Sequence, residues 1–368
     1  RDSTTSDNNT ALGSSALLSN TTGASNTAVG QGALDANTTA NSNTAVGDVS
    51  LSANTTGAEN TAIGKGALNA NTTASSNTAV GMNAMNVNTT GAGNVAVGQY
   101  ALTANTTASY NTAVGWNSAI SNTTGTNNTS LGRNSLYTNT TGGNNVAVGN
   151  AALSANTTAS YNVALGVSAL ASNTTGAYNC AFGASALLDA TTASHNTAVG
   201  YEAAANVTTG ANNIAVGNAA LGMNTTGASN TAVGRSALNA NTTADNNTAV
   251  GYQALILNTT GASNTAVGKG ALDANTTASY NVGVGVDALG KNTTGTGNCG
   301  VGGFALEDNT TGNYNTGIGR NALTNNAGAS YSTAVGYAAL GTSNADYNTA
   351  VGYNAGTAIT TGGKNTAL

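Results

Sequence analysis

The stretch Asn26–Ser42 decides the fold and reads Asn-Thr-Ala-Val-Gly-Gln-Gly-Ala-Leu-Asp-Ala-Asn-Thr-Thr-Ala-Asn-Ser. Close variants of these 17 residues fill the whole chain of 368 residues. When each unit is numbered from its first Asn, the glycine at position 5 returns every 17 residues from Gly13 to Gly336. One residue is then lost before the next such glycine, Gly352. A repeat of this kind has to be recognised first, because a missed repeat misassigns the whole fold.

The short unit predicts one β-coil rather than a pair of helices. A helical-hairpin repeat needs about 33 residues or more, and Gly and β-branched residues oppose helix formation. The chain has 49 Gly and no Pro, so every coil keeps its backbone N–H groups for the next one. We therefore predict an all-β solenoid, a β-roll or β-helix, with about 21 coils. At about 4.8 Å per coil it forms a rod on the order of 100 Å long.

The repeat runs without a break in composition, which predicts that residues 1–368 form a single continuous β-solenoid array. Neither end carries a polar capping coil, and solenoids need such caps to stay soluble. We therefore expect the chain to be a segment of a longer fibrous protein.

Alternation over Thr-Ala-Val predicts a short strand at positions 2 to 4 of each unit. Position 4 is always apolar, and position 2 is Thr or, in some units, Val, Ile or Cys. This pattern predicts that positions 2 and 4 face inward together with the Leu of position 9, whereas the Ala of position 3 faces outward. An outward column of small apolar residues suits close contact with another chain. The predicted assembly contacts are Ala28, Ala45, Ala62 and Ala79.

Asn recurs at positions 1 and 12 in almost every unit, which predicts ladders of side-chain hydrogen bonds between stacked coils. The Asn of position 12 also opens an Asn-x-Thr sequence, the acceptor for N-linked sugars. The alternative is therefore an outward Asn carrying glycans, and the two interpretations exclude each other. The glycosylation candidates are Asn37, Asn54 and Asn71.

Seven of the 13 Tyr residues lie at position 17, a variable and therefore exposed column. Neighbouring coils place some of them over one another, which predicts short stacks of rings. These stacks either stabilise the coils or offer a surface aromatic platform to sugars or to another chain. The predicted ladder residues are Tyr161, Tyr178, Tyr314, Tyr331 and Tyr347.

The side chains that most chemistry needs are scarce. Charged residues make up 6% of the chain, against about 25% in an average soluble domain. His195 stands alone in a variable column. Cys180 and Cys299 both occupy position 2, seven coils or about 33 Å apart, too far for a disulfide, which tolerates Cα separations of about 7 Å. We predict no enzyme activity, no cofactor and no metal site.

Two partner classes are also excluded by composition. Eight Lys and Arg and a net charge of −5 argue against nucleic acid. No apolar run approaches the roughly 20 residues of a membrane span.

The Asn-Thr-Ala-Val-Gly string resembles the Asn-Ser-Val-Ala-Ile-Gly motif in the head repeats of trimeric autotransporter adhesins. It is closer to the Asn-Thr-Ala-(Val/Ile)-Gly-x-x-Ala-Leu arrays of long surface and tail-fibre-like proteins. This resemblance covers the whole chain and implies a β-roll shaft that assembles with copies of itself as a trimer. The uncapped ends predict end-to-end stacking as the other way in which copies assemble. It assigns no functional residue, because the matching positions are structural.

We expect a structural, non-catalytic shaft in an extracellular fibre or filament: a surface filament, an adhesin stalk or a tail fibre. Such a protein lies outside the cell or on a cell or virion surface. The alternative is a binding module, for glycans, a host surface or ice, that uses the Thr or Tyr columns. A fibre forms long uniform rods, whereas a binding module is discrete and has a measurable partner.

Overall fold

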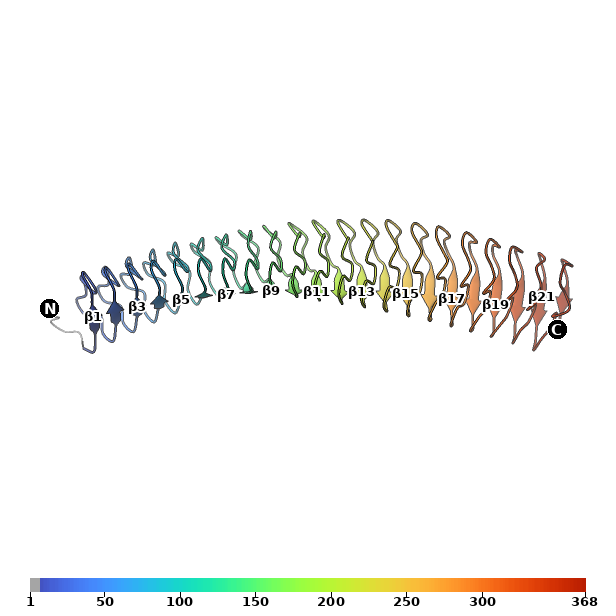
Figure 1. Cartoon of the computed structure of the whole chain (residues 1–368), viewed down its shortest axis with the longest axis horizontal. Helices are drawn as coiled ribbons and strands as arrows, with labels where there is room; N and C mark the ends of the chain where they lie inside the picture. Colours follow the sequence, from blue (N-terminus) through green and yellow to red (C-terminus); the bar gives the residue numbers. More distant parts are fainter. Residues whose placement is uncertain (1–6) are drawn as a thin grey trace. The chain divides into compact units, whose positions relative to one another are not determined.

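The structure is a computed structural model that describes residues 7–368. It divides into two compact units, Arg1–Phe182 and Gly183–Leu368. Each unit is an all-β parallel solenoid with one repeat per turn, and about 21 turns make up the chain (Figure 1). No helix occurs among residues 7–368, which confirms the predicted fold class.

Every turn contributes one short strand, formed by positions 2 to 4 of the repeat. The strands of the first unit are β1 (Thr10–Leu12), β2 (Thr27–Val29), β3 (Thr44–Val46), β4 (Thr61–Ile63), β5 (Thr78–Val80), β6 (Val95–Val97), β7 (Thr112–Val114), β8 (Thr129–Leu131), β9 (Val146–Val148), β10 (Val163–Leu165) and β11 (Cys180–Phe182). Those of the second unit are β12 (Thr197–Val199), β13 (Ile214–Val216), β14 (Thr231–Val233), β15 (Thr248–Val250), β16 (Thr265–Val267), β17 (Val282–Val284), β18 (Cys299–Val301), β19 (Thr316–Ile318), β20 (Thr333–Val335), β21 (Thr349–Val351) and β22 (Thr366–Ala367).

Within each unit, consecutive strands pair in parallel and like residues face like residues. In β3 and β4, Ala45 pairs with Ala62 and Val46 with Ile63. The turn that lost a residue keeps this register, because Thr333 of β20 still pairs with Thr349 of β21. The missing residue is therefore absorbed in the connection between the strands and not in the sheet.

The glycine at position 5 turns the chain sharply as it leaves the strand. Gly98 has a φ of 130°, which side chains of L-residues rarely allow. A Cβ there would also lie 2.5 Å from the carbonyl oxygen of Gly115 in the next turn. Both the backbone angle and the close approach of the next turn therefore require glycine.

The interior is a thin double row of small and medium side chains. Asn26, Ala28, Ala33 and Leu34 are fully buried, as are the equivalent residues of most turns. Leu34 has a φ of 52°, and its backbone N–H donates a hydrogen bond to the carbonyl of Ser50 in the next turn. Position 9 thus points its Leu side chain inward from a left-handed backbone conformation.

The predicted sidedness of the strand is wrong. Position 3 faces inward, and positions 2 and 4 face outward and are partly exposed. The reason is space, as Gly283 at position 3 shows. A Cβ built on Gly283 lies 3.2 Å from Cγ of Leu272 and 3.0 Å from the carbonyl oxygen of Ala288. Ala fits between the strand and the opposite wall, and a Val or Ile side chain does not.

Candidate functional surfaces

The Asn side chains of positions 1 and 12 are buried and form the predicted ladders. Nδ2 of Asn37 donates to Oδ1 of Asn20 in the preceding turn, at 2.8 Å, and to the carbonyl of Ala40, at 3.1 Å. From position 1, Nδ2 of Asn26 donates to the same Ala40 carbonyl at 2.8 Å, and its Oδ1 accepts the backbone N–H of Asn43. Each turn is thus braced across its width and tied to the next turn.

This geometry overturns the glycosylation candidates. Asn37, Asn54 and Asn71 have no exposed surface. Nδ2 of Asn71 donates to Oδ1 of Asn54 at 2.9 Å and to the carbonyl of Ala74. A sugar on any of these amides would need its side chain to leave the interior.

The assembly contacts predicted on the alanine column are wrong for the same reason as the sidedness of the strand. Ala28, Ala45, Ala62 and Ala79 are fully buried inside the first unit and have no surface to offer another chain. The signal that could have found this was Asn at position 1. An inward Asn at position 1 and a period of two place position 3 inward as well.

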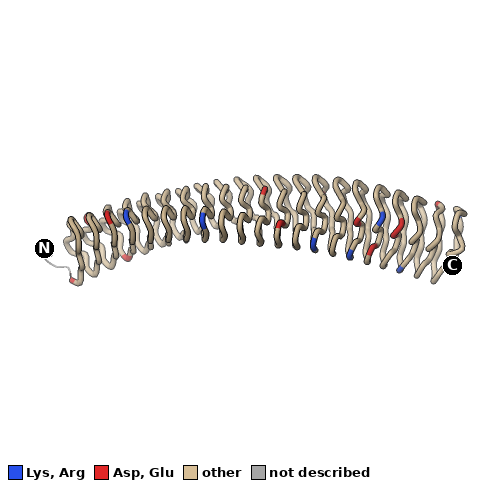
Figure 2. Tube along the Cα trace, viewed as in Figure 1, with Lys and Arg blue, Asp and Glu red and all other residues tan. Residues whose placement is uncertain are grey.

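The outward side of the strands instead carries position 4, which is apolar in every turn. Ile63, Leu165 and Phe182 are 40%, 41% and 37% exposed. Position 2 beside it holds Thr, Val, Ile or Cys, and neither column contains a charged residue. Charged residues are scattered over other positions of each unit (Figure 2).

The tyrosines of position 17 stack as their column predicts. The rings of Tyr161 and Tyr178 lie 5.1 Å apart and within 2° of parallel. Tyr331 stacks on Tyr314 at 5.4 Å and on Tyr347 at 5.1 Å. A further pair at position 6 was not predicted. Its members, Tyr337 and Tyr353, lie 5.2 Å apart.

The remaining isolated groups give no catalytic arrangement. His195 is exposed at position 17. Cys180 and Cys299 lie half-buried on the outward side of their strands, not in the core as a substitution for an inward Thr implies. Partial burial raises the pKa of both thiols above that of free cysteine.

Three buried serines form the one cluster of hydroxyls in the interior of the described first unit. Ser118 and Ser135 replace Ala at position 8, and Ser130 replaces Ala at position 3. Oγ of Ser130 lies 2.8 Å from Oγ of Ser118 and 2.6 Å from Oγ of Ser135. The hydroxyls bond to one another and to backbone carbonyls, so the cluster satisfies itself and has no acid or base to activate it.

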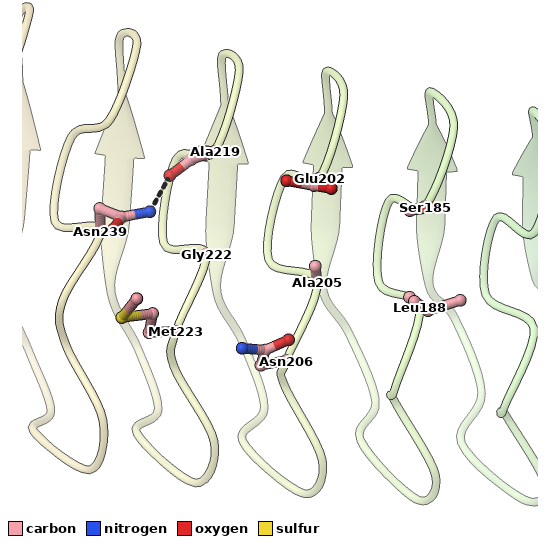
Figure 3. Close-up of a pocket in the computed structure, with 9 residues that line it drawn as sticks. All are labelled: Ser185, Leu188, Glu202, Ala205, Asn206, Ala219, Gly222, Met223 and Asn239. Atoms are coloured by element: carbon pink, nitrogen blue, oxygen red, sulfur yellow. Dashed lines mark hydrogen bonds between the residues drawn. The ribbon is translucent and has the colours of Figure 1, made fainter.

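The second unit has a shallow open depression on the side opposite its strands (Figure 3). It is lined by Ser185, Leu188, Glu202, Ala205, Asn206, Ala219, Gly222, Met223 and Asn239. Nδ2 of Asn239 donates to the Ala219 carbonyl at 2.8 Å. Glu202 brings the only carboxylate to this depression and, through a hydrogen bond, raises the pKa of the adjacent Tyr201. A single acid in an open depression supports no acid–base pair.

Acidic residues approach one another further along the second unit. Burial, and then the charge of Asp287, raise the pKa of Asp273, whereas burial and the charge of Asp308 raise that of Glu307. Lys291 neutralises part of this charge through an ion pair with Asp308 at 2.6 Å. Among residues 7–368, no group of three His, Cys, Asp or Glu side chains is placed to hold a metal ion.

Comparison with known proteins adds no relative: no protein-family model matches the chain, and no curated protein matches it. The described residues also contain no helix long and apolar enough to cross a membrane.

Proposed function

We propose that the chain is a structural, non-catalytic shaft of an extracellular fibre or filament. The observation that carries this proposal is that each turn binds the next through the same contacts. Asn88 donates to Oδ1 of Asn71 and accepts from Asn105, and this pattern repeats through most of the turns. A turn added to such a stack brings its own bonds, so length can grow without any new kind of contact. That property suits a spacer or a fibre.

Most of the side chains that recur are the ones that the interior uses. Positions 1, 3, 5, 8, 9 and 12 are nearly constant and hold the turns together, whereas most exposed positions vary from turn to turn. A binding or catalytic site usually needs constant exposed groups at one place. The extracellular location comes from the resemblance to surface and tail-fibre repeats.

The self-contact that a fibre needs is best placed on the outward strand face, defined as positions 2 and 4. In the first unit this face presents two side chains from each of the strands β1 to β11, or 22 side chains. A standard protein interface uses about 20 to 30 residues per partner. A second copy of the chain has the same spacing between turns, so its ridges of side chains match those of the first at every turn.

Electron microscopy and a set of variants test this proposal together. Wild-type protein should form uniform rods that contain more than one copy. Replacing Val80, Val97 and Val114 by Glu places three charges on the outward strand face and should reduce the particle mass to that of one chain. The matched control replaces Gln31, Gln99 and Asn150 at position 6 by Glu, because that column already accepts Asp48 and Lys65.

The two parts of the proposal fail separately. Rods with an unchanged mass in the Val variant would place the self-contact elsewhere and leave the shaft intact. Wild-type protein that forms discrete particles, and binds a soluble partner, would overturn the shaft itself.

The second candidate function is a surface binding module on the tyrosines. Its support is their exposure: Tyr110 and Tyr280 are 69% and 71% exposed. In the stacks, however, each ring covers its neighbour, so a sugar finds open ring faces at the ends only. A glycan array tests this function, and loss of a bound glycan in Tyr110→Ser and Tyr280→Ser would support it.

A further inference from the structure

One exposed column is as constant as the interior. Position 14 is Thr in 18 consecutive turns, from Thr22 to Thr311, and every one of these residues is exposed. Ten of them lie in the first unit and eight in the second. The members are Thr22, Thr39, Thr56, Thr73, Thr90, Thr107, Thr124, Thr141, Thr158, Thr175, Thr192, Thr209, Thr226, Thr243, Thr260, Thr277, Thr294 and Thr311.

The hydroxyls of this column form no hydrogen bonds within the described residues. The neighbouring Thr of position 13 bonds to the next turn, as when Oγ1 of Thr55 donates to the carbonyl of Thr72 at 3.0 Å. Within residues 7–368, no Oγ1 of position 14 takes part in a hydrogen bond to the chain. Thr56, for example, contributes only its backbone N–H, to the same Thr72 carbonyl.

The shape of Thr does not explain its constancy either. Position 2 is also partly exposed and β-branched, and there Val95, Val146 and Ile214 replace Thr. At position 14 no turn from 22 to 311 carries Val or Ile, so the column keeps the hydroxyl as well as the β-branched shape. No turn carries Ser there, although Ser is frequent in the exposed column at position 17, so the column keeps the methyl group too.

The N-linked acceptor sequence is not the reason for the column. In two of these 18 turns the Asn of position 12 is replaced, by Ala190 and by Val207, which destroys the Asn-x-Thr sequence that ends at position 14. Thr192 and Thr209 nevertheless remain at position 14 and are exposed. The Thr is therefore retained independently of the Asn that precedes it by two residues.

We propose that the position-14 threonines are acceptor sites for O-linked glycosylation, a proposal that does not depend on the shaft function. The threonines lie in a bend outside the strands, where a modifying enzyme reaches the hydroxyl. In the reaction, Oγ of Thr forms a bond to the anomeric carbon of a nucleoside-diphosphate sugar. The bond from that carbon to the diphosphate breaks, the nucleoside diphosphate leaves, and the hydroxyl proton goes to solvent or to a base of the transferase.

A row of sugars would add hydrated polar groups to a surface that has few charged side chains. Only 6% of the residues are charged, and the outward strand face is largely apolar. Hydrated sugars along the bend would keep such a surface soluble, and the Thr methyl group restricts rotation at each linkage. Recognition of ice by the same hydroxyls fits less well, because ice needs a flat face. Position 17 carries side chains as different in height as Ser76, Gly93 and Tyr110.

Mass spectrometry of protein purified from the organism that makes it tests this proposal. Trypsin cuts after Lys65 and Arg133 and releases peptide 66–133, which contains Thr73, Thr90, Thr107 and Thr124. The native peptide should exceed its sequence mass by one to four sugar increments, and fragmentation should place them on these residues. The quadruple Thr→Val variant should lose all increments.

The matched control changes the same peptide at position 2, where Val occurs naturally. The triple variant Thr78→Val, Thr112→Val and Thr129→Val should keep the full mass increment. A native peptide with its bare sequence mass would overturn the proposal. If that unmodified protein also shapes ice crystals, the hydroxyl column serves ice recognition instead.

Discussion

Single residues in left-handed conformations shape every turn. Position 9 takes φ near 50°, as at Leu34 and Leu68, and position 17 takes φ near 60°, as at Tyr110. A left-handed L-residue costs about 1 to 2 kcal/mol. Full burial of a Leu side chain contributes about 1.5 to 3 kcal/mol and offsets that cost at position 9. At position 9, packing overrides the local backbone preference.

Replacing the corner glycine should destabilise a turn through both its backbone angle and its contact with the next turn. We expect Gly98→Ala to lower the free energy of unfolding by about 2 kcal/mol or more, since strained φ/ψ regions cost about 1 to 3 kcal/mol before any clash. Denaturant unfolding followed by circular dichroism measures the change.

Gly352→Ala separates the two causes. Gly352 has nearly the same φ, 134°, but a Cβ there meets its nearest atom at 3.6 Å. Its effect should be clearly smaller than that of Gly98→Ala. Equal effects would show that the approach of the next turn does not matter.

The two thiols report directly on which way the strand faces. Because position 2 points outward, Cys180 and Cys299 should react with iodoacetamide in the native protein, and each Cys→Ser variant should lose one labelled site. Their raised pKa means less thiolate at pH 8 than in free cysteine. The rate should therefore rise between pH 8 and pH 10 by more than the roughly fourfold gain of a thiol with a pKa of about 8.5. Thiols that react only after unfolding would contradict the outward orientation.

At the scale of the element, the Asn ladder takes the place of a large apolar core. The contribution of the ladder to stability can be seen where the ladder is interrupted. Ser343 occupies the turn after Asn326, and Oδ1 of Asn326 is left buried without a hydrogen-bond partner. A buried polar atom without a partner costs about 1 to 3 kcal/mol. The ladder is therefore favourable as a continuous series and costly at its breaks.

Removing one interior rung should expose that cost. Asn88→Ala takes away the acceptor of Asn105, at 2.8 Å, and the donor to Asn71 and to the carbonyl of Gly91. We expect a loss of about 2 to 4 kcal/mol in unfolding free energy, from more than one unsatisfied group. Asn127→Ser, at an exposed position that holds Ser in other turns, should change stability by less than about 0.5 kcal/mol. Similar losses of unfolding free energy in both variants would contradict a stabilising role for the ladder.

Much of this element could be predicted from sequence, and its sidedness could not. The period of 17 and the constant Gly and Asn columns predicted the solenoid and its ladders, because stacked identical turns place like residues together. The alternation over Thr-Ala-Val is compatible with positions 2 and 4 facing inward or with position 3 facing inward. The prediction that the more apolar residues, at positions 2 and 4, face inward was wrong. The width of the interior determines which positions of the strand face inward, and that width depends on how Leu272 and its equivalents fill the opposite wall.

At the scale of the whole molecule, each unit is a series in which a turn contacts its neighbours along the chain. Stability in such solenoids is approximately a sum over repeats and their interfaces. Changes by whole turns should therefore be tolerated, whereas fractions of a turn should not. The turn Ser332–Tyr347, one residue short, is a natural small departure that keeps its strand pairing.

Deleting the complete turn Asn94–Tyr110 should leave the protein folded, with a melting temperature within a few degrees of wild type. Asn77 and Asn111 would then become neighbours in the position-1 ladder. Deleting only Asn94–Ala101 should disrupt the fold from that point, because the following strand then meets a bend. Circular dichroism and limited proteolysis measure both. Equal tolerance of the two deletions would contradict stacking by whole turns.

Because the turns are nearly identical in sequence, a turn can pair with the wrong neighbour during folding. If a chain segment slips by 17 residues, almost every contact forms again, so the interior alone scarcely distinguishes the correct partner from the next one along. The buried serine cluster does distinguish it. Ser118 bonds to the Ser130 hydroxyl of the next turn in one alignment only, and a slip by one turn places Ala147 opposite it instead, whereas Ser130 and Ser135 lie in one turn and stay bonded. Turns that differ from the consensus, such as those that carry these serines, therefore help to fix the register in which the turns stack.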